Sequence, residues 1–349
     1  MLNFIRNCDI LINRHIYIFG KYDINQDTEN GVNDMKIVFT DSDTVTTGDI
    51  SLDRFGKYGE VVKYGVTAPD QTAERVKDAE GIMCNKTLIT ADIMSAVPGL
   101  RYIGILATGC NNVDLDRAAE LGIRVTNVPG YSTDGVVQLV FGYISELYGN
   151  IGKYRASVDA GDWKKSRTFS YFPYPITKMA GKTIGIVGLG TIGSRVAKIA
   201  DAFGMNVIVH TRTKKPDCPY RYAEMEELLR ESDIVTLHCP LTEQTRGLMD
   251  SRAFSLMKQG AVLINTSRGP VVDERALRDA LDSGKLMGAG LDVLCTEPMA
   301  EDCPLYGAPN CIITPHIAWA AREIRERLIE IAADNLEAFI GGKTLNAVV

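Results

Sequence analysis

Short apolar runs alternate with longer segments in which apolar residues recur every three or four positions, starting at Met35. A short apolar run bounded by turn residues is typical of a buried parallel strand, and the longer periodicity is typical of a helix. Up to residue 133 the pattern predicts four strands, at 37–39, 81–84, 102–106 and 123–126, with helices at 91–97 and 113–121. This alternation predicts a parallel sheet covered by helices on both faces.

A second alternating series begins near Lys182 and predicts six strands, at 183–187, 207–209, 233–237, 261–264, 290–293 and 311–313. Six such strands are typical of the doubly wound sheet that binds dinucleotides. The helix at 274–281 has an N-cap signal in Asp273 and a stop signal in Gly284. We therefore predict an α/β fold with two doubly wound parallel-sheet domains, a flavodoxin-like substrate domain and a Rossmann dinucleotide-binding domain.

The chain has 349 residues, more than the roughly 250–300 that one hydrophobic core usually serves. Helices predicted at 133–147 and 320–340 would carry the chain between two domains. We predict a substrate domain from residues 35–133 and 317–349, a dinucleotide-binding domain from 134–316, and an active site in the cleft between them. Residues 1–34 are interpreted as an N-terminal extension, either variable or due to an upstream start site, rather than a functional module.

Composition narrows the function classes. Hydrophobic residues make up 45% and charged residues 23%, as in ordinary globular proteins. A net charge of −6 without a long basic run argues against nucleic-acid binding. No segment reaches the ~20 apolar residues of a membrane span, and the N-terminus lacks a signal-peptide layout, so a cytoplasmic protein without a membrane partner is expected. The eight cysteines show no CxxC spacing, which predicts neither disulfides nor a metal site and makes Cys84, Cys239 and Cys295 small core residues.

A glycine-rich loop, with Gly188, Gly190 and Gly193, follows a predicted strand and opens a predicted helix. The first glycine permits a tight turn, the second lets the backbone approach a pyrophosphate, and the third lets the helix pack on the strand. The helix N-terminus, with Thr191 and Ile192, offers free N–H groups to phosphates. A tight turn alone would also explain the glycines, but their place between strand and helix favours a dinucleotide site. The stripe predicted to be buried on this helix is Ile192, Val196, Ile199 and Phe203.

The next strand of this series ends without an acidic residue. NAD enzymes usually carry an acid there for the ribose 2′-hydroxyl, whereas this chain has Thr211 followed by Arg212. A 2′-phosphate would suit this cationic corner, so NADP is favoured over NAD. The alternative is that these are solvated surface charges, and one side chain can reverse the preference.

Three polar residues, Arg268, Glu297 and His316, lie at or just after predicted strand ends, where α/β sheets bind ligands. Reduction of a 2-oxo acid at C2 needs the carboxylate held, the carbonyl polarised and its oxygen protonated. Arg268 offers a planar fork of donors, and an imidazole such as that of His316 is a general acid at physiological pH. Glu297 can bind the far ring nitrogen and favour the protonated imidazole. Each residue alone also fits a structural role, but their joint placement favours catalysis.

From Met35 to its end the chain resembles the D-isomer-specific 2-hydroxyacid dehydrogenase family. The matching segments are 107–114, 126–132, the glycine loop, 238–242, 265–269, 290–293 with Glu297-Pro298, and Pro315-His316. The resemblance implies that Arg268, Glu297 and His316 are catalytic and that Thr108 and Gly109 bind the substrate carboxylate through backbone N–H groups. It also implies that Asp292 contacts the nicotinamide amide. Further cofactor contacts would come from Cys239, Pro240, Thr245, Thr266 and Ser267.

Within this family, Asn85-Lys86, the loop at 107–109, the stretch 163–175 and residues 316–319 look most like the glycerate dehydrogenase or hydroxypyruvate (glyoxylate) reductase branch. The resemblance implies reversible, NAD(P)-dependent reduction of hydroxypyruvate or glyoxylate to D-glycerate or glycolate, with Asn85 and Lys86 at the distal end of the substrate. The chain departs from the related pattern at Gly130, where Ala is common, and at Cys110-Asn111, where an aromatic residue is more usual.

Several alternatives remain open. Oxidation of D-lactate or D-3-phosphoglycerate is a sibling chemistry, although phosphoglycerate enzymes usually need a further cationic site and often a regulatory domain. A dinucleotide-sensing, corepressor-like binding protein would retain the same three polar residues. Formate dehydrogenases of the superfamily carry Gln where this chain has Glu297, which argues against them. The resemblance also implies a homodimer through about residues 131–175, where Tyr171, Phe172 and Tyr174 would be interface anchors or would pack on their own domain.

Overall fold

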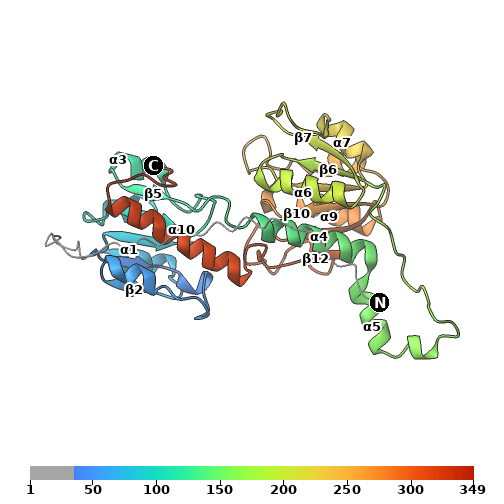
Figure 1. Ribbon diagram of the computed structural model, residues 1–349, viewed down its shortest axis with the longest axis horizontal. Coiled ribbons are helices and arrows are strands. Elements are labelled where there is room, and N and C mark those ends of the chain that lie inside the picture. Colours follow the sequence, from blue (N-terminus) through green and yellow to red (C-terminus); the bar gives the residue numbers. More distant parts are fainter. Residues whose placement is uncertain (1–34) are drawn as a thin grey trace, which may run out of the picture.

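The computed structural model describes residues 35–349, and the predicted N-terminal extension lies outside the described residues. Two parallel sheets organise the described chain (Figure 1). The first sheet has the order β2-β1-β3-β4-β5, which is the flavodoxin-like order. Its strands are β1 (Ile37–Phe39), β2 (Val61–Lys63), β3 (Gly81–Cys84), β4 (Tyr102–Ile105) and β5 (Arg124–Thr126). The sequence pattern missed β2 because this short edge strand is only partly buried and ends in a lysine.

Both faces of this sheet are covered, as the alternation predicted. In β1, Ile37 and Phe39 pack on the face that α10 (Arg322–Ile340) covers, and Val38 packs on the other. Side chains alternate along a strand, so one short run can contribute to two cores. The shorter elements of this unit are α1 (Thr72–Val76), α2 (Ala91–Ser95), α3 (Leu115–Glu120) and the 3-10 turns η1 (Ser42–Thr44), η2 (Asp53–Tyr58) and η3 (Pro69–Gln71).

The second sheet has seven parallel strands in the order β12-β11-β10-β9-β6-β7-β8. They are β6 (Thr183–Val187), β7 (Asn206–His210), β8 (Arg221–Tyr222), β9 (Ile234–Leu237), β10 (Ala261–Asn265), β11 (Leu286–Leu291) and β12 (Cys311–Ile313). Two parallel-sheet α/β units confirm the predicted fold class. The two-residue edge strand β8 was not predicted, because a strand this short leaves no periodic pattern.

The predicted position of β11 was wrong, because this strand begins at Leu286 rather than at residue 290. Two glycines interrupt its apolar run, and both face α4 (Thr133–Gly149). A β-carbon on Gly290 would lie 2.5 Å from the Tyr143 ring, and one on Gly288 would lie 2.7 Å from Leu147. The glycines let the helix pack directly on the strand. Because they take the place of apolar side chains, the sequence of this strand lacks the continuous apolar run by which the other strands were predicted.

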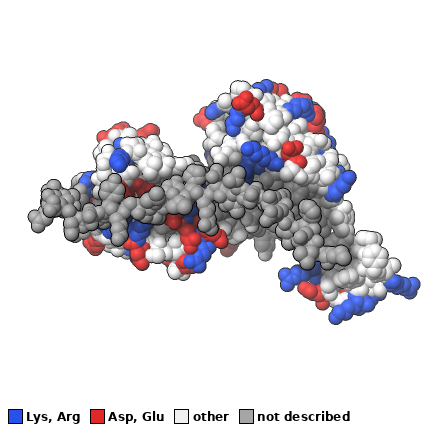
Figure 2. Space-filling model, in the orientation of Figure 1, with Lys and Arg blue, Asp and Glu red and all other residues white. Residues whose placement is uncertain are grey.

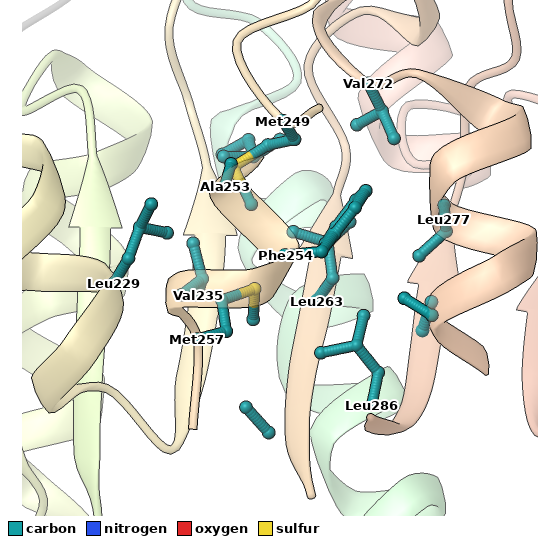
Figure 3. Close-up of a cluster of buried hydrophobic side chains, with 14 of the residues drawn as sticks. Leu229, Val235, Met249, Ala253, Phe254, Met257, Leu263, Val272, Leu277 and Leu286 are labelled. Carbon is teal, nitrogen blue, oxygen red and sulfur yellow. The ribbon is translucent and has the colours of Figure 1, made fainter. Parts of the chain in front are cut away.

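Helices cover both faces of this sheet. One face packs on α7 (Met225–Glu231), α8 (Ser251–Leu256) and α9 (Glu274–Asp282), whose side chains Leu229, Phe254 and Leu277 meet the sheet in Figure 3. The other face packs on α4 and α6 (Thr191–Ala202). The predicted cap is present, since the Asp273 carboxylate accepts hydrogen bonds from the first turn of α9. The predicted burial of Phe203 was wrong: this residue is 47% exposed.

Beyond α4, the chain forms an arm that extends away from the seven-stranded sheet (Figure 1). The arm comprises α5 (Ile151–Asp159), the 3-10 turn η4 (Trp163–Lys165) and the segment up to residue 177. The remaining turn, η5 (Gly269–Val271), follows β10. Within residues 35–349, no helix is long and apolar enough to cross a membrane.

Candidate active site

A cleft of about 640 Å³ lies where the carboxyl ends of strands from both sheets meet. Its wall includes loops that follow β3, β4 and β5 of the first sheet and β6, β9, β10 and β11 of the second. Twelve of the predicted site residues line it: Asn85, Lys86, Thr108, Gly109, Gly190, Thr191, Ile192, Thr266, Arg268, Asp292, Glu297 and His316. The structure therefore brings together residues that are up to about 230 positions apart in the chain.

Glu297 and His316 form a hydrogen-bonded pair in this cleft. The Nδ1 atom of His316 lies 2.7 Å from Oε2 of Glu297, and Leu294 N donates to Oε1 at 3.0 Å. Burial opposes ionisation of Glu297, but the hydrogen bond and charge of His316, with the Leu294 N–H, outweigh it and lower the pKa of the carboxyl. Glu297 is therefore an acceptor for Nδ1–H, which leaves Nε2 as the ring nitrogen available to a substrate.

The backbone of His316 has a left-handed conformation, with φ of 54°. For a residue other than glycine this costs roughly 1–3 kcal/mol, and it persists only where surrounding contacts enforce it. The enforcing contact is Asp292, which is 1% exposed. Its carboxylate accepts from Ile317 N at 2.8 Å, from Ala318 N at 2.9 Å and from the Thr314 hydroxyl. The Asp292 carboxylate thus stabilises the conformation of the loop that carries His316. Its contact with the nicotinamide amide stays a prediction.

Arg268 approaches the loop at 107–109 from the other side of the cleft. Its Nη1 donates to Ser267 O at 2.7 Å, and its Nη2 lies 2.6 Å from where a β-carbon on Gly109 would be. The loop itself is fixed, because Thr108 Oγ1 donates to Val128 O at 2.8 Å. The Arg268 guanidinium therefore lies beside the backbone of this loop in the wall of the cleft, and carboxylate binding by the N–H groups of Thr108 and Gly109 stays a prediction.

Asn85 and Lys86 have different surroundings. Asn85 is 4% exposed, and its side-chain amide donates to Thr44 Oγ1 at 3.0 Å. This hydrogen bond attaches the loop at 85–87 to the turn η1. The Lys86 side chain extends along the cleft wall, where desolvation lowers the pKa of its ammonium although Glu297 attracts it. Sequence reasoning assigned no role to Tyr131, His238 and Trp319, which also line the cleft. All three lie in segments that carry the family resemblance (126–132, 238–242 and 316–319), so their position in the sequence could have suggested a role in the site.

The dinucleotide part of the site is built around the N-terminus of α6. Gly188 has φ of 97°, and a β-carbon on Gly193 would lie 2.0 Å from Gly188 O, so both positions require glycine. A β-carbon on Gly190 would meet nothing within 4 Å, which leaves an open backbone surface for a ligand. Thr266 Oγ1 is buried and has no hydrogen-bond partner among the described residues. Buried polar atoms rarely lack partners, so this hydroxyl in the cleft wall fits a bound nicotinamide cofactor.

The other predicted cofactor residues lie outside the cleft lining. Thr211 and Arg212 follow β7, where Lys215 Nζ also donates to Ser194 Oγ of α6 at 3.3 Å. Pro240 and Thr245 belong to the loop after β9, which the Thr245 hydroxyl closes by donating to Pro240 O at 2.6 Å. Ser267 donates to Asn265 Oδ1 at 2.8 Å, and Cys239 is buried behind the loop.

One cysteine prediction was wrong. Cys84 and Cys239 are buried as expected, but Cys295 is exposed. It lies in the turn between β11 and Glu297, where its N–H donates to the Glu274 carboxylate at 2.6 Å. The apolar neighbours Val293 and Leu294 suggested burial, but Cys295 lies in the exposed turn that precedes Glu297, with its Sγ 3.7 Å from Val272 O.

Comparison with known proteins decides the family. Residues 141–318 match the family described as "D-isomer specific 2-hydroxyacid dehydrogenase, NAD binding domain". The hydroxypyruvate reductase of Blautia hydrogenotrophica is 40% identical over 322 residues, covering 90% of this chain and 99% of that protein. The chain belongs to the D-isomer specific 2-hydroxyacid dehydrogenase family. It is accordingly an oxidoreductase that acts on 2-hydroxy acids, and the predicted family is confirmed.

Two solved structures match most of this chain. A crystal structure of a protein from Thermus thermophilus matches with a TM-score of 0.81 and 39% identity, covering 90% of this chain and all of that chain. The NADPH-dependent glyoxylate/hydroxypyruvate reductase of Sinorhizobium meliloti, solved in complex with citrate, matches with a TM-score of 0.79 and 28% identity. It covers 90% of this chain and 98% of that chain. Members of this family use a nicotinamide cofactor, which the match to an NAD-binding domain supports here.

Proposed function

We propose that this enzyme reduces hydroxypyruvate or glyoxylate to D-glycerate or glycolate, reversibly, with His316 as the acid/base. The observation that carries the proposal is the His316–Glu297 pair at 2.7 Å, which lines the same cleft as Arg268 and Lys86. A proton donor and two cations in one small cleft suit a short 2-oxo acid. Relatives whose names state hydroxypyruvate or glyoxylate reduction support this substrate class.

In the proposed mechanism, the substrate carboxylate binds the N–H groups of Thr108 and Gly109 and the Arg268 guanidinium. The cofactor, when bound, supplies the hydride that reduces C2. His316 donates the Nε2 proton to the carbonyl oxygen, and Arg268 polarises that carbonyl through its second donor. Glu297 accepts a hydrogen bond from Nδ1–H and so orients the ring. The doubly protonated ring gives its Nε2 proton to the substrate oxygen and is left as the neutral Nδ1–H form. In the oxidative direction His316 accepts the hydroxyl proton instead.

NADP(H) is the cofactor that we propose to be preferred. The end of β7 has no carboxylate, and Thr211, Arg212 and Lys215 are close in sequence there. Lys215 already contacts Ser194 on the phosphate-binding helix, so its ammonium lies beside the expected position of the adenosine ribose. Cations at this place favour a 2′-phosphate.

We also propose a cytoplasmic homodimer in which the arm at 151–177 contacts the partner subunit. Phe169 and Phe172 are 91% and 80% exposed, and exposed aromatic side chains in one segment favour an interface. Tyr154 packs on the rings of Tyr171 and Tyr174 at 6.4 and 5.3 Å, so these two tyrosines stabilise the arm itself. Figure 2 shows Lys and Arg side chains on the same arm. The free thiols of the described residues fit a reducing compartment.

Initial rates with hydroxypyruvate, glyoxylate, pyruvate and 3-phosphohydroxypyruvate, each with NADH and NADPH, test the proposed substrate class. We expect hydroxypyruvate or glyoxylate to have the highest kcat/KM. A higher kcat/KM for pyruvate or for the phosphorylated substrate would favour the D-lactate or phosphoglycerate alternatives. Absence of turnover with every pair would favour a dinucleotide-sensing binding protein.

A further inference from the structure

A buried aspartate that the proposed mechanism does not use lies directly behind the Lys86 loop. Asp41 follows β1 and is 3% exposed. Its Oδ1 accepts from Asn85 N at 2.8 Å, and its Oδ2 accepts from Lys86 N at 2.6 Å and Thr87 N at 2.7 Å. The Thr87 hydroxyl also donates to Oδ2 at 2.9 Å. Within residues 35–349, no side-chain nitrogen of Lys, Arg or His forms an ion pair with this carboxylate.

Three consecutive backbone N–H groups that converge on one carboxylate define the shape of a loop closely. Each of these hydrogen bonds involves an ionised acceptor and is therefore among the stronger kind in proteins. A buried carboxylate without such donors would be strongly unfavourable, so the loop and the aspartate stabilise each other. The Asn85 side chain adds a further attachment, through its hydrogen bond to Thr44 Oγ1.

The loop presents Lys86 to the catalytic residues. Within residues 35–349, the Lys86 ammonium has neither a hydrogen bond nor an ion pair, yet it lines the cleft with Arg268 and Glu297. The charges of Glu297, Arg268 and Asp41 all act on it. A lysine side chain has several rotatable bonds, so it reaches a small substrate reproducibly only if its own backbone is fixed.

We propose that Asp41 is a positioning residue that fixes the loop at 85–87, so that the Lys86 ammonium binds the hydroxyl of the substrate distal to its 2-oxo acid group. The proposal rests on the proposed function and adds the origin of its specificity. Hydroxypyruvate carries a hydroxyl at C3, pyruvate carries a methyl group there, and glyoxylate has no C3. A site built to hydrogen-bond a hydroxyl discriminates strongly against an analogue that lacks it.

The test is the ratio of kcat/KM for hydroxypyruvate to kcat/KM for pyruvate, measured in the wild type and in five variants. Asp41→Asn replaces one acceptor oxygen of the carboxylate with an amide NH2 group. This group is itself a donor, so it cannot accept hydrogen bonds from the backbone N–H groups of the loop. We expect it to lower the ratio about tenfold through a higher KM for hydroxypyruvate, while the KM for the cofactor changes less than about twofold. Lys86→Met should lower the ratio at least as much, and the double variant should lower it no further than Lys86→Met alone.

Two further variants keep the result interpretable. Thr87→Val removes only the hydroxyl donor to Asp41, so the variant should fold. It should lower the ratio about threefold. It therefore tests the positioning role even if Asp41→Asn does not fold. Asp78→Asn is the matched control: Asp78 forms an ion pair with Lys36 on the surface of the same sheet, and its loss should leave the ratio unchanged.

The outcomes separate the two proposals. A wild type that reduces none of these acids contradicts the proposed function itself. If the wild type is active but Asp41→Asn and Thr87→Val lower kcat/KM for both substrates equally, the positioning role is overturned. An additive double variant would show that Asp41 acts independently of Lys86, and it would overturn the role too.

Discussion

The guanidinium of Arg268 lies against the backbone of Gly109, so close that a β-carbon on Gly109 would be 2.6 Å from Nη2. The two residues lie in loops that follow strands of different sheets, β4 and β10, and are separated by 159 positions in the chain (268 − 109). Their approach places a cation beside the N–H groups that are proposed to hold a carboxylate. The atom that would clash is the end of a flexible side chain, so crowding here would displace the guanidinium rather than unfold the protein.

Gly109→Ala should therefore lower the activity of the enzyme and leave its thermal stability nearly unchanged. We expect kcat/KM for hydroxypyruvate to fall at least about a hundredfold, because a misplaced group in an active site is costly, while Tm changes little. Gly99→Ala is the matched control, since a β-carbon on Gly99 would meet nothing within 4 Å. Steady-state kinetics and thermal unfolding of both variants check this. Near-normal activity of Gly109→Ala would contradict the proposed role of Arg268.

The Glu297–His316 pair predicts a pH effect. The hydrogen bond with His316 lowers the pKa of Glu297 despite burial, so the paired state is present above the ordinary pKa of a glutamate and is lost as the pH falls through the lowered value. The ionised Glu297 carboxylate orients the His316 ring, so kcat/KM for reduction should decline on the acid side as Glu297 is protonated. Glu297→Gln should remove this acid decline, because an amide does not titrate. A pH–rate profile with an unchanged midpoint would argue against this coupling.

The glycine loop predicts two opposite results from similar substitutions. Gly190→Ala adds a methyl group where nothing lies within 4 Å, so the fold should tolerate it while the cofactor binds at least about tenfold more weakly. Gly193→Ala would place a β-carbon 2.0 Å from Gly188 O and should lower Tm clearly. Cofactor titration by fluorescence and thermal unfolding distinguish the two. Equal losses of stability would mean that Gly190 is not a ligand-facing position.

Cofactor choice should depend on the cations after β7. Arg212→Ala is expected to lower the ratio of kcat/KM for NADPH to that for NADH about tenfold, because a charge-assisted contact with the 2′-phosphate is lost. Arg252→Ala, an exposed arginine paired with Glu226 on the surface, is the control and should leave the ratio unchanged. A wild type that prefers NADH, or a ratio that Arg212→Ala does not change, would show that the residues at 211–212 are solvated surface groups.

Hydrophobic patterning was enough to predict both sheets, because buried parallel strands are continuous apolar runs. It failed for β2 and β8, which are short edge strands, and for the start of β11, where two glycines replace apolar side chains to admit α4. These positions depend on tertiary packing, which a local pattern does not contain.

The chemistry of the site was predictable to a similar degree. Polar residues at strand ends identified Arg268, Glu297 and His316, and the structure brings all three to one cleft. Asp41 also follows a strand end but was missed, because its partners are backbone N–H groups rather than side chains. For Asp292 the position was recognised, but its attachment to the His316 loop depends on a fold that places residues 292 and 317 side by side.

His316, as the proton donor, is the residue on which the proposed reduction depends most. The most direct test compares kcat for hydroxypyruvate reduction in the wild type and in His316→Ala, with cofactor affinity measured by titration in both proteins. We predict a loss of at least about a thousandfold in kcat with cofactor affinity changed less than about threefold. Equal rates in the two proteins would contradict His316 as the proton donor and would favour a dinucleotide-sensing binding protein.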